Sequence, residues 1–171
     1  MTTVNATVSH ASANSYITLI EANAYWADHF YSETWDALQS GDKNTLIVMS
    51  TRLLDEWVDW KGIKSSDTQA LRWPRYNTVD RDNYWIDGDV IPVEVKNATA
   101  ELAGYLAKGD ATAEPDTKGF SELKVGELQL KIDKSDRDNT TVIPDSVLAI
   151  ISHYGVVRSR KNPSTVSLIR T

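Results

Sequence analysis

The stretch Gln69-Ala70-Leu71-Arg72-Trp73-Pro74-Arg75 is the most informative part of this 171-residue chain. A proline fixes its own φ and disfavours the α conformation in the residue before it, so Pro74 excludes a helix here and holds Trp73 extended. We therefore expect a stiff corner in which Trp73 is anchored in a packed site. The guanidinium groups of Arg72 and Arg75 would then contact acidic groups on the same or a neighbouring subunit.

This corner lies within a long segment, residues 62–91, which we predict to be an ordered loop. Gly62, Pro74 and Gly88 interrupt any regular pattern there. Loops of this length in compact domains are usually functional or lie at an interface. We predict that the loop forms a subunit or partner interface, made by Arg72, Trp73, Pro74, Arg75 and Trp85.

Before the loop, the sequence predicts helices. Thr18 and Glu21 have the spacing of a capping box, in which each side chain satisfies the other residue's backbone N–H group. Apolar residues at helical spacing continue from there, so we expect a first helix at about 19–30 and a short second helix at 33–40. Asp42 is the expected cap of a longer third helix that reaches about Trp60.

After the loop, two prolines mark further helix starts, Pro92 for a helix to Gly109 and Pro144 for a helix to Gly155. Between them, the alternating apolar residues of 120–133 predict a β-hairpin or extended arm that projects from the bundle. The predicted fold is therefore mainly α: a small helical bundle of four to five helices in a domain at 1–154, followed by an extended C-terminal tail at 155–171.

Composition and charge fit one acidic globular domain. The chain is 41% hydrophobic and 25% charged, with six Trp and seven Tyr. These aromatic residues indicate either a tryptophan-rich core or a surface that is covered by a partner, and composition leaves both open. The net charge of −6 divides into −10 for residues 1–154 and +4 for residues 155–171. An acidic domain argues against a protein that wraps nucleic acid over its whole surface.

The basic C-terminal tail has its own pattern. Residues 165–170 alternate apolar and polar side chains, which favours an extended strand. A single strand needs the edge of another sheet to pair with, and strand addition is a common mode of peptide capture. We predict a docking tail, with the alternative of a disordered basic end that contacts DNA; its expected contact residues are Arg158, Arg160, Lys161, Val166, Leu168 and Ile169.

The residues that usually carry chemistry are missing or scattered. The chain has no cysteine, its three histidines lie in separate segments, and it contains no G-x-S-x-G sequence. The acidic run from Asp80 to Asp89 fails the calcium-loop template, because Tyr84 and Trp85 stand where an oxygen ligand and a glycine are needed. We expect no enzymatic activity, no cofactor and no bound metal. No apolar run approaches ~18 residues and no secretory signal is present, so we expect a cytoplasmic protein without a membrane span.

Binding of single-stranded nucleic acid is a second interpretation of the loop. Cations and aromatic residues alternate along it, as in a surface on which bases stack. The residues concerned are Arg72, Trp73, Arg75, Tyr76, Arg81, Tyr84 and Trp85. Five aspartates between residues 67 and 89 oppose this interpretation and favour a structural or protein-interface role.

Several motifs together resemble one family. They are Ala13-Asn14-Ser15-Tyr16-Ile17-Thr18, Thr51-Arg52-Leu53-Leu54-Asp55, the stretch 69–75, Ile91-Pro92, Leu106-Ala107-Lys108-Gly109-Asp110 and Lys124-Val125-Gly126-Glu127-Leu128. In this combination the chain is similar, over about residues 12–154, to head–tail connector (adaptor or head-completion) proteins of tailed bacteriophages. Members are often labelled DnaT-like single-stranded DNA-binding proteins.

The resemblance implies a structural virion protein. Members form a homo-oligomeric ring, usually a dodecamer, beneath the portal protein, and the next tail component, a stopper or nozzle protein, docks on it. Double-stranded DNA passes through the channel without sequence-specific binding. The protein would be made in the host cytoplasm and end in the neck of the virion. The C-terminal tail lies outside the resemblance, and its docking on the portal is a separate prediction from its charge and its strand pattern. The alternative is a single-stranded DNA-binding replication accessory protein.

Overall fold

The computed structural model describes residues 2–110, 112, 122–125, 128–131 and 142–158. In that part of the chain, helices dominate and three small two-stranded sheets accompany them. The elements, in order, are α1 (Leu19–Ala27), α2 (Glu33–Asp36), α3 (Ser40–Trp57), β1 (Val58–Trp60), β2 (Ile63–Lys64), β3 (Arg75–Tyr76), α4 (Val93–Leu106), β4 (Glu122–Val125), β5 (Leu128–Lys131), α5 (Asp145–Ile151) and β6 (Gly155–Val157).

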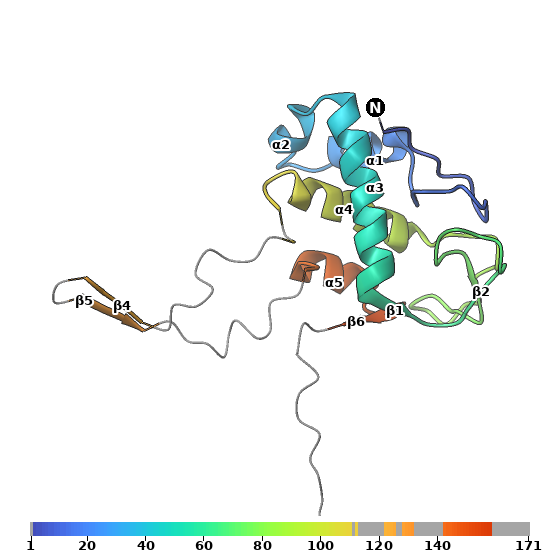
Figure 1. The fold of residues 1–171 in the computed structure, drawn as a ribbon. Coiled ribbons are helices and arrows are strands. Elements are labelled where there is room, and N and C mark those ends of the chain that lie inside the picture. Colours follow the sequence, from blue (N-terminus) through green and yellow to red (C-terminus); the bar gives the residue numbers. More distant parts are fainter. Residues whose placement is uncertain (1, 111, 113–121, 126–127, 132–141, 159–171) are drawn as a thin grey trace, which may run out of the picture.

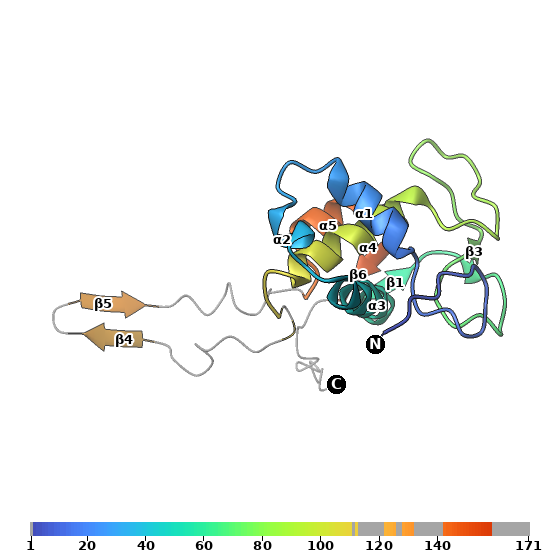
Figure 2. The same ribbon diagram turned by 90° about the horizontal axis from the view of Figure 1, so that it is seen from above.

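Helix α4 is the centre of the bundle and contacts α1, α3 and α5. Figure 2, in which α3 is seen nearly end-on, shows α1, α4 and α5 on one side of α3. Small residues make the close packing possible. A Cβ at Gly104 would lie 1.9 Å from Cζ2 of Trp26, so glycine lets the Trp26 ring rest on the helix. The ring is fixed there because its Nε1 donates to the carbonyl of Ala100 at 3.1 Å.

The helix starts are largely as predicted. The capping box is confirmed: Thr18 Oγ1 accepts from the Glu21 N–H at 3.2 Å, and Glu21 Oε2 accepts from the Thr18 N–H at 2.7 Å. Pro92 and Pro144 are the N-caps of α4 and α5, so each helix begins one residue later. The predicted mainly helical bundle is therefore confirmed in its helices, although α2 is only a single turn.

The predicted third helix was wrong at both ends. Helix α3 begins at Ser40 with Gln39 as N-cap, and it ends at Trp57 rather than Trp60. Val58, Asp59 and Trp60 form strand β1 instead, antiparallel to β6, with Val58 opposite Val157 and Trp60 opposite Gly155. Because this partner strand lies almost 100 residues later in the chain, the local apolar pattern could not distinguish the strand from another helical turn.

The pairing of β1 with β6 also places the start of the C-terminal region within the domain. Residues 155–157 are extended, as predicted for the tail, but they pair with β1 of the same domain. Two further backbone bonds lengthen the ladder, from Lys61 N to Tyr154 O at 2.9 Å and from Arg158 N to Trp57 O at 2.8 Å. The predicted boundary after Tyr154 therefore coincides with the start of β6.

The hairpin predicted within residues 120–133 is confirmed as a pair of strands. Strands β4 and β5 are antiparallel, with Glu122 opposite Lys131 and Val125 opposite Leu128. Its projection from the bundle stays a prediction. Among the described residues, no helix is long and apolar enough to cross a membrane.

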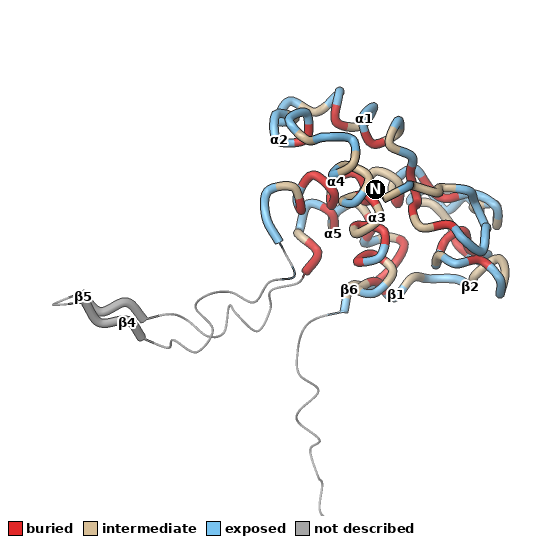
Figure 3. The backbone as a smooth tube through the Cα atoms, turned by 45° about the horizontal axis from the view of Figure 1, so that its top comes forward, coloured by how far each residue is buried: buried red, intermediate tan, exposed pale blue. Residues whose placement is uncertain are grey.

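The core has an aromatic and an aliphatic part, and Figure 3 marks the buried residues in red. Trp26, Trp35 and Trp73 are buried in the aromatic part, whereas Trp85 is 75% exposed. The tryptophan-rich core is therefore the better of the two alternatives for most of these residues. The aliphatic part lies where α3, α4 and α5 meet, and includes Leu54, Leu102, Ile143, Val147 and Ile151.

Candidate functional site

Three of the sequence motifs meet at one buried point. The hydroxyl of Tyr16 donates to the carboxylate of Asp55, which also accepts the backbone N–H of Arg72 at 3.0 Å. The Trp73 N–H in turn donates to the Tyr16 hydroxyl at 3.3 Å. Burial and the neighbouring Asp55 raise the pKa of Tyr16, and burial raises the pKa of Asp55 although both hydrogen bonds lower it. These bonds fix the start of the 69–75 corner against α3.

Trp73 is anchored in a packed site, as predicted, with 1% of its surface exposed. Its ring meets the rings of Trp60 and Tyr154 edge to face, with centroids 5.8 and 5.9 Å apart. Pro74 is buried beside it and follows a cis peptide bond. The two residues that were expected at a partner interface are thus inside the domain.

Arg75 is also buried, and its partners differ from the prediction. The guanidinium group donates to three backbone carbonyls at 3.0 Å or less, of Lys61 at 2.6 Å, Gly62 at 2.6 Å and Arg72 at 3.0 Å, and more weakly to that of Trp60 at 3.5 Å. Burial lowers the pKa of Arg75. The expected acidic partner is absent among these bonds because the loop's own turns leave carbonyls facing inward, and a planar fork of donors satisfies several at once. Arg72 does reach an acidic group, but through its backbone N–H, and its side chain is exposed.

The rest of the loop presents aromatic side chains to solvent. We call residues 62–91 the aromatic loop; it lies beside the end of α3 that leads into β1 (Figure 1). Tyr76 is 54% exposed, Tyr84 73% and Trp85 75%. Sequence reasoning gave Trp73 and Trp85 the same role, but only Trp85 is at the surface.

Local bonds hold these aromatic residues in place. Strand β3 pairs Tyr76 with Ile63 of β2, and a bridge joins Val79 to Trp85. The carboxylate of Asp80 accepts the N–H groups of Asp82 at 2.9 Å and Tyr84 at 2.8 Å, which closes the turn between them. The aspartate run therefore builds a turn. The aromatic loop is an ordered surface rather than a random coil.

Positive charge around this surface is limited. The aromatic loop contains four basic and five acidic residues. Arg75 is buried, and Arg81 donates to the carbonyls of Ala149 at 2.7 Å and Ile150 at 3.2 Å. Lys64 donates to the carbonyl of Gln69 at 2.8 Å. The cation that the structure leaves most available next to the aromatic residues is Arg72.

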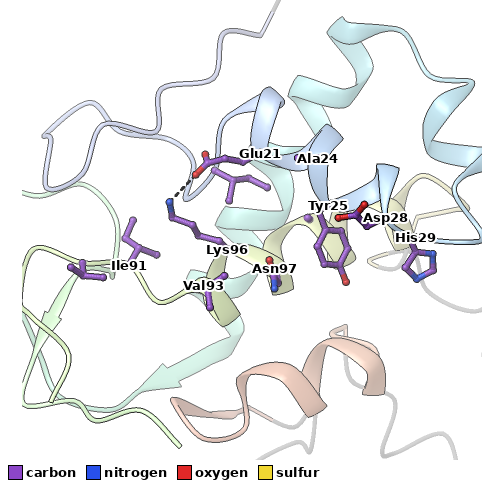
Figure 4. Close-up of a pocket in the computed structure, with 12 residues that line it drawn as sticks. Glu21, Ala24, Tyr25, Asp28, His29, Ile91, Val93, Lys96 and Asn97 are labelled. Atoms are coloured by element: carbon purple, nitrogen blue, oxygen red, sulfur yellow. Dashed lines mark hydrogen bonds and ion pairs between the residues drawn. The ribbon is translucent and has the colours of Figure 1, made fainter. Parts of the chain in front are cut away.

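A second surface feature lies between α1 and α4, where Figure 4 shows a groove. It has a volume of about 760 Å³ and a mainly apolar lining that includes Ala24, Ile91 and Val93. Lys96 Nζ binds Glu21 Oε1 at 2.7 Å at its edge. Tyr25 donates to Glu101 at 3.1 Å; burial and this carboxylate raise the pKa of Tyr25 to about 12. No sequence signal predicted this groove, because its residues come from α1, α4 and the segments next to them, which lie far apart in the sequence.

Among the predicted tail residues, only Arg158 lies in the described part of the chain. Its Nε donates to Asp59 Oδ1 at 2.9 Å, and this pairing lowers the pKa of Asp59. Both side chains are 59% exposed, so the contact is a surface ion pair within the domain. Arg160, Lys161, Val166, Leu168 and Ile169 lie outside the described residues.

The comparison with known proteins concerns the whole chain. A family model described as "Putative DnaT-like ssDNA binding protein" matches residues 1–171. No curated protein and no solved structure matches the chain. The match agrees with the label that the sequence motifs suggested, and it covers both the buried corner and the exposed aromatic residues. The chain therefore belongs to the family that this model describes.

Proposed function

We propose that the protein binds single-stranded DNA through the exposed aromatic residues Tyr76, Tyr84 and Trp85. The observation that carries this proposal is an ordered loop that exposes three large aromatic rings, in a chain whose family is described by single-stranded DNA binding. Every base has a flat face, so aromatic side chains bind single strands with little regard for sequence. The buried Trp73 and Arg75 support this surface from beneath.

The charge of the loop determines how such binding would behave. Because acidic residues slightly outnumber basic ones there, stacking rather than phosphate neutralisation would supply most of the affinity. Each phosphate contact on a single strand contributes about −0.7 to the slope of log affinity against log salt. With Arg72 and a few neighbouring cations available, we expect a shallow slope of about −1 to −3.

The test is fluorescence anisotropy with a labelled oligothymidylate of about 16 nucleotides, titrated at several salt concentrations. Trp85→Ala should weaken binding about 5- to 150-fold, since one stacked base contributes ~1–3 kcal/mol. Phe30→Ala is the matched control, because Phe30 is an aromatic residue that is 85% exposed outside the loop. Equal affinities of the wild type and Trp85→Ala, or no binding by the wild type at low salt, would refute the proposal.

A second candidate is a head-to-tail adaptor without enzymatic activity, and the charge of the domain favours it. Residues 2–110 and 142–158 contain 17 acidic and 10 basic side chains. Such a surface would repel DNA that passes along it, as a channel wall requires. The groove between α1 and α4 and the exposed Ile20 and Phe30 provide apolar surface for contact with other proteins.

In this second function the protein would assemble as a ring, with twelve subunits as the family resemblance implies. The ring would lie between the portal and the next tail component of a phage, first in the host cytoplasm and then in the virion. Negative-stain images of the protein mixed with its portal would test this. Rings stacked on the portal support the adaptor, whereas a monomer that ignores the portal but binds the oligonucleotide supports the first function.

A further inference from the structure

The end of α5 and the residues after it hold the aromatic loop at several points. We call residues 153–158 the C-terminal strap. Lys61, at the base of the loop, donates its N–H to Tyr154 O at 2.9 Å and its Nζ to His153 O at 2.7 Å. The His153 ring nitrogen donates to Val79 O at 3.1 Å, in the middle of the loop.

Further contacts continue this attachment. The Tyr154 ring packs on Trp73, and Arg81 donates to the carbonyls at the end of α5. The strap itself is held by the ladder with β1 and by the pair of Arg158 with Asp59. The ladder is only about five residue pairs long, from Trp57 with Arg158 to Lys61 with Tyr154. Such a short two-stranded ribbon has little stability of its own.

We infer that the C-terminal strap is a clamp: it can detach from β1, and while it is attached it keeps the aromatic loop ordered. When β6 pairs with β1, the loop is fastened at its base, middle and corner. When the strap leaves β1, the bonds at Lys61 and Val79 are lost together, and the turn that displays Tyr84 and Trp85 loosens. A partner that binds the C-terminal residues in an extended form competes with β1 and would thereby act on the aromatic surface.

Two glycines provide the first test, in the full chain. A Cβ at Gly155 would lie 2.6 Å from Val58 Cγ1 and 3.0 Å from Asp59 O, so Gly155→Ala prevents the strap from seating. A Cβ at Gly109 would meet nothing within 4 Å, so Gly109→Ala is the matched control. The probes are the amide protons of Asp80 and Ile86, which donate to Tyr84 O and Thr78 O. We expect Gly155→Ala to speed their hydrogen exchange at least about tenfold, and Gly109→Ala to leave it unchanged.

A reversible cross-link provides the second test, in the opposite direction. Val58 and Val157 face each other next to the hydrogen-bonded pair of Trp57 and Arg158, so their Cα atoms are about 4.5 Å apart, within disulfide range. The chain has no other cysteine, so the Val58→Cys/Val157→Cys variant can form only this bond within a molecule. Oxidation should slow exchange at Asp80 and Ile86 several-fold, and reduction should reverse it.

These hydrogen-exchange measurements test the clamp directly and do not depend on whether the loop binds DNA. The Lys61 amide, which donates to Tyr154 O, reports whether the strap is open. If Lys61 exchanges faster in Gly155→Ala while Asp80 and Ile86 do not change, the loop is independent of the strap and the inference is wrong. If Gly155→Ala also exposes the amides of α4, it unfolds the domain; the oxidised and reduced forms of the cross-linked variant then decide, and equal exchange in both overturns the clamp.

Discussion

Arg75→Met is the substitution that most directly tests how the aromatic loop is built. Methionine keeps an unbranched apolar stem but removes the donors that bind the carbonyls of Lys61, Gly62 and Arg72. A hydrogen bond to a charged group contributes about 1.5–3 kcal/mol. Three such bonds set an upper limit of ~5–9 kcal/mol.

The expected loss is smaller than this limit for two reasons. Lys61 and Gly62 are exposed residues, so water replaces part of what their carbonyls lose. Burying the guanidinium group also costs free energy, which its lowered pKa reflects. Breaking a buried charged contact typically costs ~3–5 kcal/mol, and we expect the lower end, about 3 kcal/mol, in the free energy of unfolding. That is a large part of the ~5–15 kcal/mol stability of a typical domain.

The assay is urea denaturation followed by tryptophan fluorescence and circular dichroism. Arg52→Met is the matched control, since Arg52 pairs with Glu56 at 4.0 Å on an exposed face and should contribute under ~0.5 kcal/mol. Arg75→Lys should recover only part of the loss, because one ammonium group cannot reach three carbonyls. If Arg75→Met loses less than ~1 kcal/mol, or no more than Arg52→Met, then Arg75 does not organise the loop as the structure indicates.

Three further predictions address the core, the pH dependence and the hairpin. Trp73→Ala should lose ~3–5 kcal/mol of stability, or fail to fold or assemble. Trp85→Ala is its control and should melt like the wild type. A wild-type melting curve for Trp73→Ala would contradict the buried position of Trp73. The pKa of Glu21 lies below its usual 4.5, because hydrogen bonds from Lys96 and Thr18 outweigh the opposing effect of burial. The charged Glu21 side chain therefore stabilises the domain at pH values above its usual pKa, and this contribution is lost as the pH falls through the lowered pKa. In a pH series of melting curves, Lys96→Met should show a smaller loss of stability on the acid side. Deleting residues 120–133 should leave the helical circular dichroism of the domain unchanged while particles fail to mature in the adaptor case; unfolding on deletion would place the hairpin in the core.

Local signals predicted the helix starts well. The Thr18–Glu21 capping box and the prolines before α4 and α5 act within one helical turn, so the sequence contains all that decides them. The end of α3 was different. Val58 and Trp60 continue the apolar pattern of the helix, but in the structure they pair with β6. The sequence around residue 60 contains no signal for a partner strand that begins at residue 155.

The candidate site was predictable in place but not in detail. Composition and length singled out the segment 62–91, which the structure shows to be an ordered loop with an aromatic surface. Which aromatic residue is inside and which is outside depends on distant residues: Trp73 is enclosed by Trp60 and Tyr154 from two other parts of the chain. The carbonyl partners of Arg75 could not be foreseen either, since any residue type supplies a carbonyl.

The residues that carry the family resemblance and the residues that we expect to carry function are different sets. Tyr16, Asp55 and Trp73 join three motifs at a buried point, where they hold the corner of the aromatic loop against α3. A motif made of such residues identifies a fold, because it fixes how the loop leaves the helix, and its Tyr16 and Trp73 side chains are buried. Tyr84 and Trp85 do face solvent, and they can change without disturbing that buried point. Relatives with the same corner could therefore bind single-stranded DNA, a neighbouring subunit or another protein, and exchanging only the exposed rings of the loop is the direct way to separate these functions.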